Sequence, residues 1–83
     1  MEKRSCYFNV FICDADQCVE ENHPFAYLTN AYQFMTKQMK EYGMTDGFIP
    51  TFKEVMLAVH TEGKYSHNGD FVLSKVFFED KEN

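Results

Sequence analysis

The chain of 83 residues has no tryptophan, two prolines, and only one arginine, Arg4, among its eight cationic side chains. Thirteen acidic side chains outnumber these cations, so the formal net charge is −5. Proteins that bind phosphate backbones need clustered cations, and arginine is the side chain best suited to reading guanine. This composition therefore disfavours direct binding of nucleic acid and favours a protein partner with a basic surface.

Long apolar runs are also missing, because no stretch approaches the 18 residues that indicate a membrane-spanning helix. No secretory signal precedes the first apolar run, and the three cysteines, an odd number, do not suggest a paired disulfide framework. We therefore expect a cytoplasmic protein that does not contact a membrane. The thiols of Cys6, Cys13 and Cys18 are interpreted as small buried hydrophobic groups.

No complete motif for catalysis, a cofactor or a metal ion is present. Asp14 and Asp16 have the spacing of a calcium loop, but Val19 and Phe25 stand where that loop needs glycine and glutamate. The cysteines lack the two matched pairs typical of structural zinc sites, and nothing singles out one thiol as a nucleophile. We therefore predict a protein that is not an enzyme and has no cofactor, and keep a thiol or metal protein as a third alternative.

Aromatic side chains are abundant for so short a chain, with nine phenylalanines and five tyrosines. A protein of 9.8 kDa buries only roughly 64% of its surface on folding. We expect one small domain over residues 1–83 whose thin core leaves little room for a ligand pocket. The rings then either fill that core or form an apolar surface for a partner, so we predict self-association or a complex.

Residues 5–13 alternate in the manner of a β-strand rich in aromatic and β-branched side chains. One face carries Cys6, Phe8, Val10 and Ile12, and the other carries Tyr7, Asn9, Phe11 and Cys13. Because the second face is also largely apolar, we expect this strand to be central in its sheet or covered on both sides. A partner chain could supply that cover.

Residues 14–23 hold four carboxylates and no cation. We interpret them as an acidic loop leading into a helix, with Asn22 or His23 near the N-cap and Pro24 in the first turn. Apolar residues recur at helical spacing over residues 25–42, and Gly43 follows as the residue that ends the helix. The predicted inward stripe consists of Phe25, Leu28, Tyr32, Met35, Met39 and Tyr42.

A capping box marks the start of a second helix, because Thr51 is followed three residues later by Glu54. We predict that this helix covers residues 52–61 and ends at Gly63. A strand is also possible there, since several residues of the segment tolerate an extended conformation.

Asn68 and Gly69 form the dipeptide preferred in type I′ turns of β-hairpins. Pairing outward from this turn predicts three opposed pairs: His67 with Asp70, Tyr65 with Val72, and Glu62 with Lys75. Residues 71–78 form the second strand of the hairpin, and residues 79–83 are predicted to be a frayed tail.

Together these segments predict the order β-α-α-β-β in an α+β domain, a three-stranded, mainly antiparallel sheet with both helices on one face. Such a sheet offers one uncovered side and two edges as docking surfaces. Residues 49–55, followed by Asn68 and Gly69, also resemble a degenerate winged helix-turn-helix protein. That resemblance implies a regulator that acts as a homodimer, and it is the second hypothesis, although few cations are available for a recognition helix.

The preferred hypothesis is a small, acidic protein-binding module that inhibits or regulates a partner by occluding a basic surface. A nucleic-acid-processing enzyme would be such a partner, and inhibitors encoded by phages and mobile elements have this kind of composition. The predicted binding residues combine negative charge with apolar anchors. They are Asp14, Asp16, Glu20, Glu21, Tyr7 and Phe11.

Overall fold

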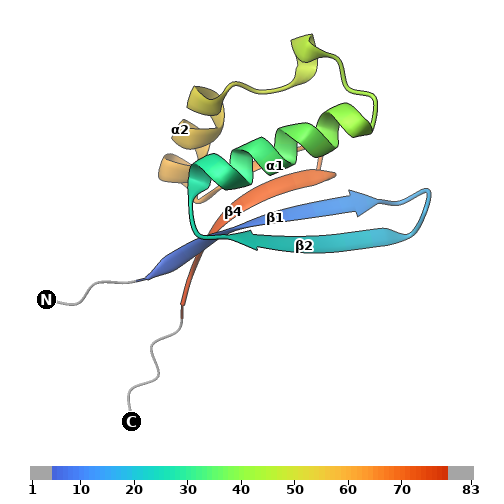
Figure 1. The fold of residues 1–83 in the computed structure, drawn as a ribbon. Coiled ribbons are helices and arrows are strands. Elements are labelled where there is room, and N and C mark those ends of the chain that lie inside the picture. Colours follow the sequence, from blue (N-terminus) through green and yellow to red (C-terminus); the bar gives the residue numbers. More distant parts are fainter. Residues whose placement is uncertain (1–4, 79–83) are drawn as a thin grey trace, which may run out of the picture.

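A computed structural model of the chain describes residues 5–78 and shows an α+β arrangement of two layers (Figure 1). The elements along the chain are β1 (Cys6–Asp14), β2 (Val19–Phe25), α1 (Leu28–Glu41), the 3₁₀ turn η1 (Asp46–Phe48), α2 (Phe52–Glu62), β3 (Lys64–His67) and β4 (Phe71–Phe77). The four strands form one antiparallel sheet in the order β2-β1-β4-β3. The predicted class is confirmed, whereas the predicted three strands and the order β-α-α-β-β are wrong.

The missed element is β2, which replaces the second half of the predicted acidic loop and the start of the predicted helix. Its seven residues pair with β1 from Asp14 opposite Val19 to Phe8 opposite Phe25. Pro24 therefore lies in a strand at the edge of the sheet, where a residue without an N–H group is tolerated. The proline and acidic residues that suggested a helix start are features that protect an edge strand from further pairing.

Helix α1 begins at Leu28 with Tyr27 as its N-cap, so the predicted caps at Asn22 and His23 are wrong. The predicted inward stripe is confirmed in its middle. Met35 and Met39 are fully buried, and Leu28 and Tyr32 pack against the core. The ends of the stripe differ from the prediction, because Phe25 belongs to β2 and Tyr42 is 48% exposed. Gly43 follows the helix at φ 93°, as predicted for the residue that ends it.

The start and end of α2 follow the local signals in the sequence. The backbone amide of Thr51 donates to Oε1 of Glu54 at 2.9 Å, and the Glu54 amide donates back to Oγ1 of Thr51 at 3.2 Å. Gly63 ends the helix in the left-handed region at φ 83°. The predicted capping box is therefore confirmed, and the alternative of a strand over residues 52–61 is wrong.

The second hairpin has the predicted turn but not the predicted register. Asn68 and Gly69 have φ values of 56° and 78°, and the Asp70 amide donates to the carbonyl of His67 at 3.0 Å. His67 nevertheless pairs with Phe71, one residue beyond the predicted partner. The carbonyl of Asp70 accepts a hydrogen bond from the amide of Cys13 at 2.9 Å, which holds Asp70 against β1.

That shift of one residue decides which side chains are buried. Tyr65 pairs with Leu73 rather than Val72, and Leu73 faces the helices with no exposed surface. A slip of one residue would exchange the two faces of the strand. The predicted pair of Glu62 with Lys75 does not form, since Glu62 ends α2 and the Lys75 amide donates to the carbonyl of Gly63.

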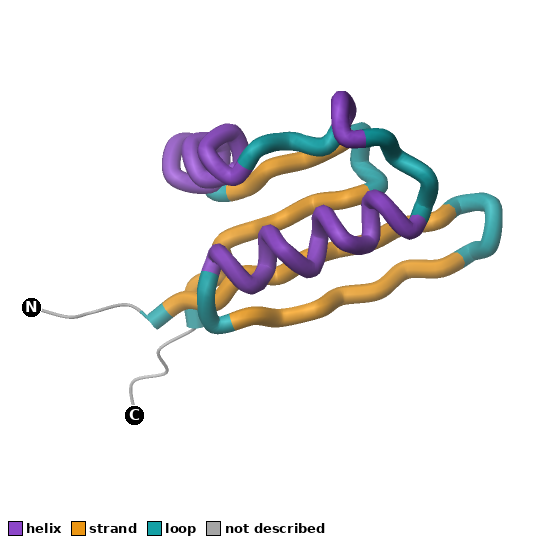
Figure 2. Tube along the Cα trace, turned by 45° about the horizontal axis from the view of Figure 1, so that its top comes forward, coloured by secondary structure: helices purple, strands orange, loops and turns teal. Residues whose placement is uncertain are grey.

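Both helices lie on one face of the sheet, as predicted, and the hydrophobic core fills the space between the layers (Figure 2). The buried core residues are Val10, Ile12, Ala31, Met35, Met39, Val55, Val59, Phe71 and Leu73. The hairpin of β3 and β4 joins this sheet through the pairing of β4 with β1, so it does not project as the wing of a winged helix-turn-helix protein. The predicted frayed tail at residues 79–83 lies outside the described residues. Within residues 5–78 no helix is long and apolar enough to cross a membrane.

Candidate partner-binding surface

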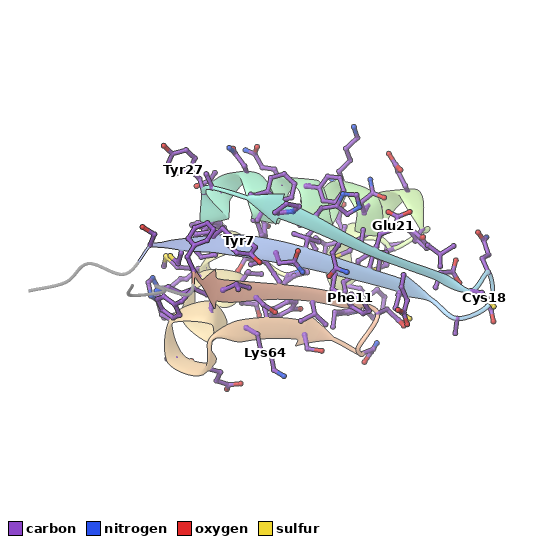
Figure 3. All side chains as sticks on the ribbon, turned by 90° about the horizontal axis from the view of Figure 1, so that it is seen from below. Tyr7, Phe11, Cys18, Glu21, Tyr27 and Lys64 are labelled. Atoms are coloured by element: carbon purple, nitrogen blue, oxygen red, sulfur yellow. The ribbon has the colours of Figure 1, made fainter. Side chains whose placement is uncertain are left out.

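The side of the sheet opposite the helices, here called the open face, is left uncovered by the elements that the structure describes (Figure 3). Its side chains are Tyr7, Asn9, Phe11 and Cys13 of β1, Val72, Ser74 and Val76 of β4, Glu20, Asn22 and Pro24 of β2, and Lys64 and Ser66 of β3. None of them is buried, whereas Val10, Ile12 and Leu73 on the helix side are at most 1% exposed. Alternation along β1 therefore divides its apolar residues between a packed face and an exposed one.

The two predicted aromatic anchors lie on this open face. Tyr7 and Phe11 both project from β1, the second strand of the sheet order, and both are partly exposed (Figure 3). The ring of Phe78 joins them, since its centroid lies 5.2 Å from that of Tyr7. Phe78 is 55% exposed and was not predicted as a binding residue. The alternation of Val72, Ser74, Val76 and Phe78 along one strand was the signal that could have placed it on this face.

An apolar hollow of about 580 Å³ opens at one end of the open face. Its lining comes from β1, β2, the residues after β2, and the end of β4: Tyr7, Asn9, Asn22, Pro24, Phe25, Ala26 and Phe78. Nδ2 of Asn9 donates to Oδ1 of Asn22 at 2.9 Å across the two strands. This pair of amides is the polar part of a lining that is otherwise largely apolar.

The four predicted acidic residues are not brought together into one patch. Asp14 ends β1, where its Oδ1 accepts a hydrogen bond from the amide of Asp16 at 3.1 Å and so helps to fix the turn. Glu20 pairs with Cys13 and lies on the open face. Glu21 lies on the helix side, with Oε1 only 2.8 Å from Nε2 of the half-exposed His23. Strand β2 therefore places its two glutamates on opposite faces.

A second hollow, of about 400 Å³, lies where the two hairpin turns meet. Its walls include Asp14, Asp16, His67, Asp70 and Tyr42. The ring of Tyr42 packs edge-on against that of Phe71, with centroids 5.6 Å apart. Partial shielding of the half-exposed Tyr42 from water, together with the negative charges of Asp14 and Glu21, raises the pKa of this tyrosine. Within the described part of the chain, histidine, cysteine and carboxylate side chains form no cluster of three or more that could hold a metal ion.

The prediction that all three thiols are buried is wrong. Cys6 and Cys13 are only partly buried, and Cys18 is exposed in the turn of the first hairpin, where its φ is 55° (Figure 3). A four-residue connection with one left-handed residue closes this hairpin. The position of Cys18, directly before β2, is therefore determined by the geometry of the turn rather than by packing.

Comparisons with protein-family models, with characterised proteins and with solved structures gave no match to this chain. Function is therefore inferred from the placement of the chain's own residues.

Proposed function

We propose that this protein is a non-enzymatic binding module that docks a partner protein on the open face and so occludes a basic surface of that partner. The observation that carries the proposal is the exposure of Tyr7 and Phe11 on an interior strand of the sheet, with no described element over them. Interior strands have the most regular and rigid pairing in a sheet, so they present side chains at fixed spacing. Rigid aromatic anchors of this kind dominate the energetics of many protein interfaces.

The size of the protein supports a binding role for these rings. An 83-residue chain has few apolar residues to spare, and yet Tyr7, Phe11, Val72, Val76 and Phe78 are not used in the described core. They form two groups, Tyr7 with Val76 and Phe78 and Phe11 with Val72, on either side of the Asn9–Ser74 pair. Clustered apolar surface in a small protein marks an interaction site more often than a packing defect. A partner that covers the open face would bury this surface and supply the missing second layer.

Charge supports a basic partner. The net charge of −5 favours approach to a positive surface. Glu20 lies on the open face itself, and Asp14 and Asp16 lie at the hairpin end of β1, so negative charge borders the aromatic anchors on one side. Enzymes that process nucleic acids carry basic grooves for the phosphate backbone, which makes them the class of target that we propose.

The proposed action is that of an inhibitor or regulator of the kind encoded by phages and mobile elements, located in the cytoplasm. Occlusion needs no catalytic group, because the bound module excludes the natural ligand of the basic surface by its volume and charge. The three thiols support a reducing compartment, since Cys18 is exposed and would be open to oxidation elsewhere.

Affinity capture from a lysate of the native host tests this proposal with two matched variants. One variant removes two open-face rings, Tyr7→Ser with Phe11→Ser, and the other removes two exposed apolar groups on the helix side, Phe48→Ser with Leu57→Ser. We expect the open-face variant to lose a specific partner that wild type and the helix-side variant both retain. The purified partner should then bind the open-face variant at least tenfold more weakly than wild type.

Two results would contradict the proposal. Equal loss of the partner in both variants would mean that the interface is not the open face. Binding that is insensitive to salt would contradict a basic partner surface, because exposed charge pairs are screened beyond about 8 to 10 Å at physiological ionic strength.

A further inference from the structure

The apolar hollow on the open face has the chemistry of a site for one large apolar side chain. The rings of Tyr7 and Phe78 stand 5.2 Å apart at a tilt of 44°, and Pro24 adds a third apolar wall from β2. The hollow is wide open to solvent, and its space of about 580 Å³ has room for an aromatic or long aliphatic side chain together with the backbone next to it. Cavities with such walls bind apolar groups because water inside them makes few hydrogen bonds.

The amide pair beside the hollow supplies groups that can recognise a peptide backbone. Asn9 uses Nδ2 and Asn22 uses Oδ1 in the hydrogen bond that joins them. Oδ1 of Asn9 and Nδ2 of Asn22 then remain as an acceptor and a donor, and no residue of the described chain satisfies either of them. A peptide group presents one donor and one acceptor, so this pair matches a backbone amide next to the bound side chain.

Glu20 adds a negative charge at a defined distance from the hollow. It lies on the same face of β2 as Pro24, four residues away and thus roughly 13 Å along the strand at ~3.3 Å per residue. Its partner on β1, Cys13, is six residues from Tyr7, so the far wall of the hollow is roughly 20 Å from Glu20. The ion pair found within residues 5–78 joins Glu21 to His23, and Glu20 forms none with the described side chains. A cation of the partner therefore has no competitor for this carboxylate among the described side chains.

We infer that the open face binds an extended segment of the partner in which a large apolar side chain and a lysine or arginine stand four to six positions apart. The apolar side chain packs into the hollow against Pro24 and against the contacting rings of Tyr7 and Phe78. The adjacent backbone amide bonds Asn9 and Asn22, and the cation pairs with Glu20. An extended segment advances by about the same distance per residue as β2, which sets the spacing of four to six. This inference rests on the proposed function and specifies the chemistry of the partner at that site.

Selection from a displayed library of random short peptides on the immobilised protein provides the test. We expect the enriched peptides to share an aromatic or long aliphatic residue and a lysine or arginine four to six positions away. The best enriched peptide is then synthesised with a fluorescent label and titrated by anisotropy. Its binding site is mapped from nitrogen-15 NMR shifts of the side-chain amides of Asn9 and Asn22.

A charge exchange separates the predicted contact from a general effect of charge. Glu20→Lys should weaken the selected peptide about two- to fivefold or more, and a peptide with glutamate in place of its cation should recover binding to that variant. Glu41→Lys is the matched control on helix α1, where an exposed carboxylate is also reversed. It should change the affinity of the selected peptide by less than twofold, and Tyr7→Ser should lower that affinity at least tenfold.

Several outcomes would overturn this inference. They differ from the outcomes that would overturn the proposed function. No enriched peptide, enriched peptides without the cation, or no recovery in the charge exchange would each reject the segment chemistry. If a host partner still depends on Tyr7 and Phe11, the proposed function stands and the partner uses a folded surface instead. Sedimentation that shows a homodimer disrupted by Tyr7→Ser would reject both, because the open face would then be occupied by a second copy.

Discussion

A threonine in place of valine on each face of the sheet tests which face is buried. Val10 on β1 has no exposed surface and packs among core residues, whereas Val72 on β4 lies on the open face opposite Phe11. The two substitutions, Val10→Thr and Val72→Thr, make the same change of a methyl group to a hydroxyl, and both residue types suit a strand. The difference in their effects therefore reports the difference between the two environments.

The expected magnitudes follow from burial. At Val10 the new hydroxyl loses water and meets only apolar neighbours, which lowers the free energy of unfolding by about 1–3 kcal/mol. At Val72 the hydroxyl stays in contact with water, so the change is about 0.5 kcal/mol or less. An 83-residue domain has a total stability of roughly 4–12 kcal/mol, which makes the first effect large and the second barely measurable.

Urea unfolding followed by far-ultraviolet circular dichroism measures both values, since the chain has no tryptophan for fluorescence. Equal destabilisation by the two variants would refute the uncovered open face. If that loss became smaller on dilution of the protein, a second copy would be the cover, because the stability of a dimer depends on concentration. If it did not, another segment of the same chain would be the cover.

Three further predictions concern the two ends of α2 and the ionisation of Tyr42. Thr51→Ala should lower the free energy of unfolding by about 0.5–2 kcal/mol in the same urea assay, because the capping box is lost. The control is Thr45→Ala, which should have almost no effect because the exposed side chain of Thr45 makes no capping bond. Gly63→Ala should destabilise by roughly 1 kcal/mol or more, because alanine is strained at φ 83°, whereas Gly47→Ala, at a glycine without positive φ, should not. Tyr42 should ionise above its ordinary pKa of 10.0 in an ultraviolet absorbance titration, and Tyr42→Phe should reduce the late step, to which Tyr65 with its raised pKa also contributes. Because the folded-state pKa is the higher one, the contribution of Tyr42 to stability is complete below pH 10 and should be lost as the pH rises through the folded-state value.

Local signals in the sequence predicted the parts of the fold that depend on neighbouring residues. The capping box at Thr51, the glycines that end both helices, and the turn at Asn68 each satisfy backbone groups within a few residues. The inward position of Met35 follows equally from helical spacing, because one turn of helix determines which residues share a face. These features do not depend on how the strands pair.

The main errors in the fold concern how the strands pair. Strand β2 has an unfavourable local sequence, with acidic residues and Pro24, and it is ordered as a strand by its ladder with β1. The register of the second hairpin depends on the hydrogen bond between Asp70 and Cys13, which are far apart in the sequence. Neither contact leaves a periodic signal, so propensity and spacing could not reveal them.

The candidate surface was predictable only in part for a related reason. Alternation placed Tyr7 and Phe11 on one face and Val10 on the other, as the structure has them. Both faces are apolar, however, so the sequence did not determine which one the helices would cover. The apolar hollow depends on the meeting of β2 with the end of β4, and its residue Phe78 lies far from Tyr7 in the chain.

The distribution of protective features over the sheet also favours the open face over the edges as the binding surface. Edge β2 carries Pro24 and Glu20, and edge β3 is only four residues long and carries the exposed Lys64. Prolines, charges and short length are the means by which natural sheets prevent addition of another strand. Over β1 and β4 the open face carries no charged side chain, and two rings and two valines lie among its seven residues. Because both edges are protected, association is directed to the open face, where side chains rather than backbone groups select the partner. Selection by side chains makes specific recognition of one basic surface physically reasonable for so small a domain.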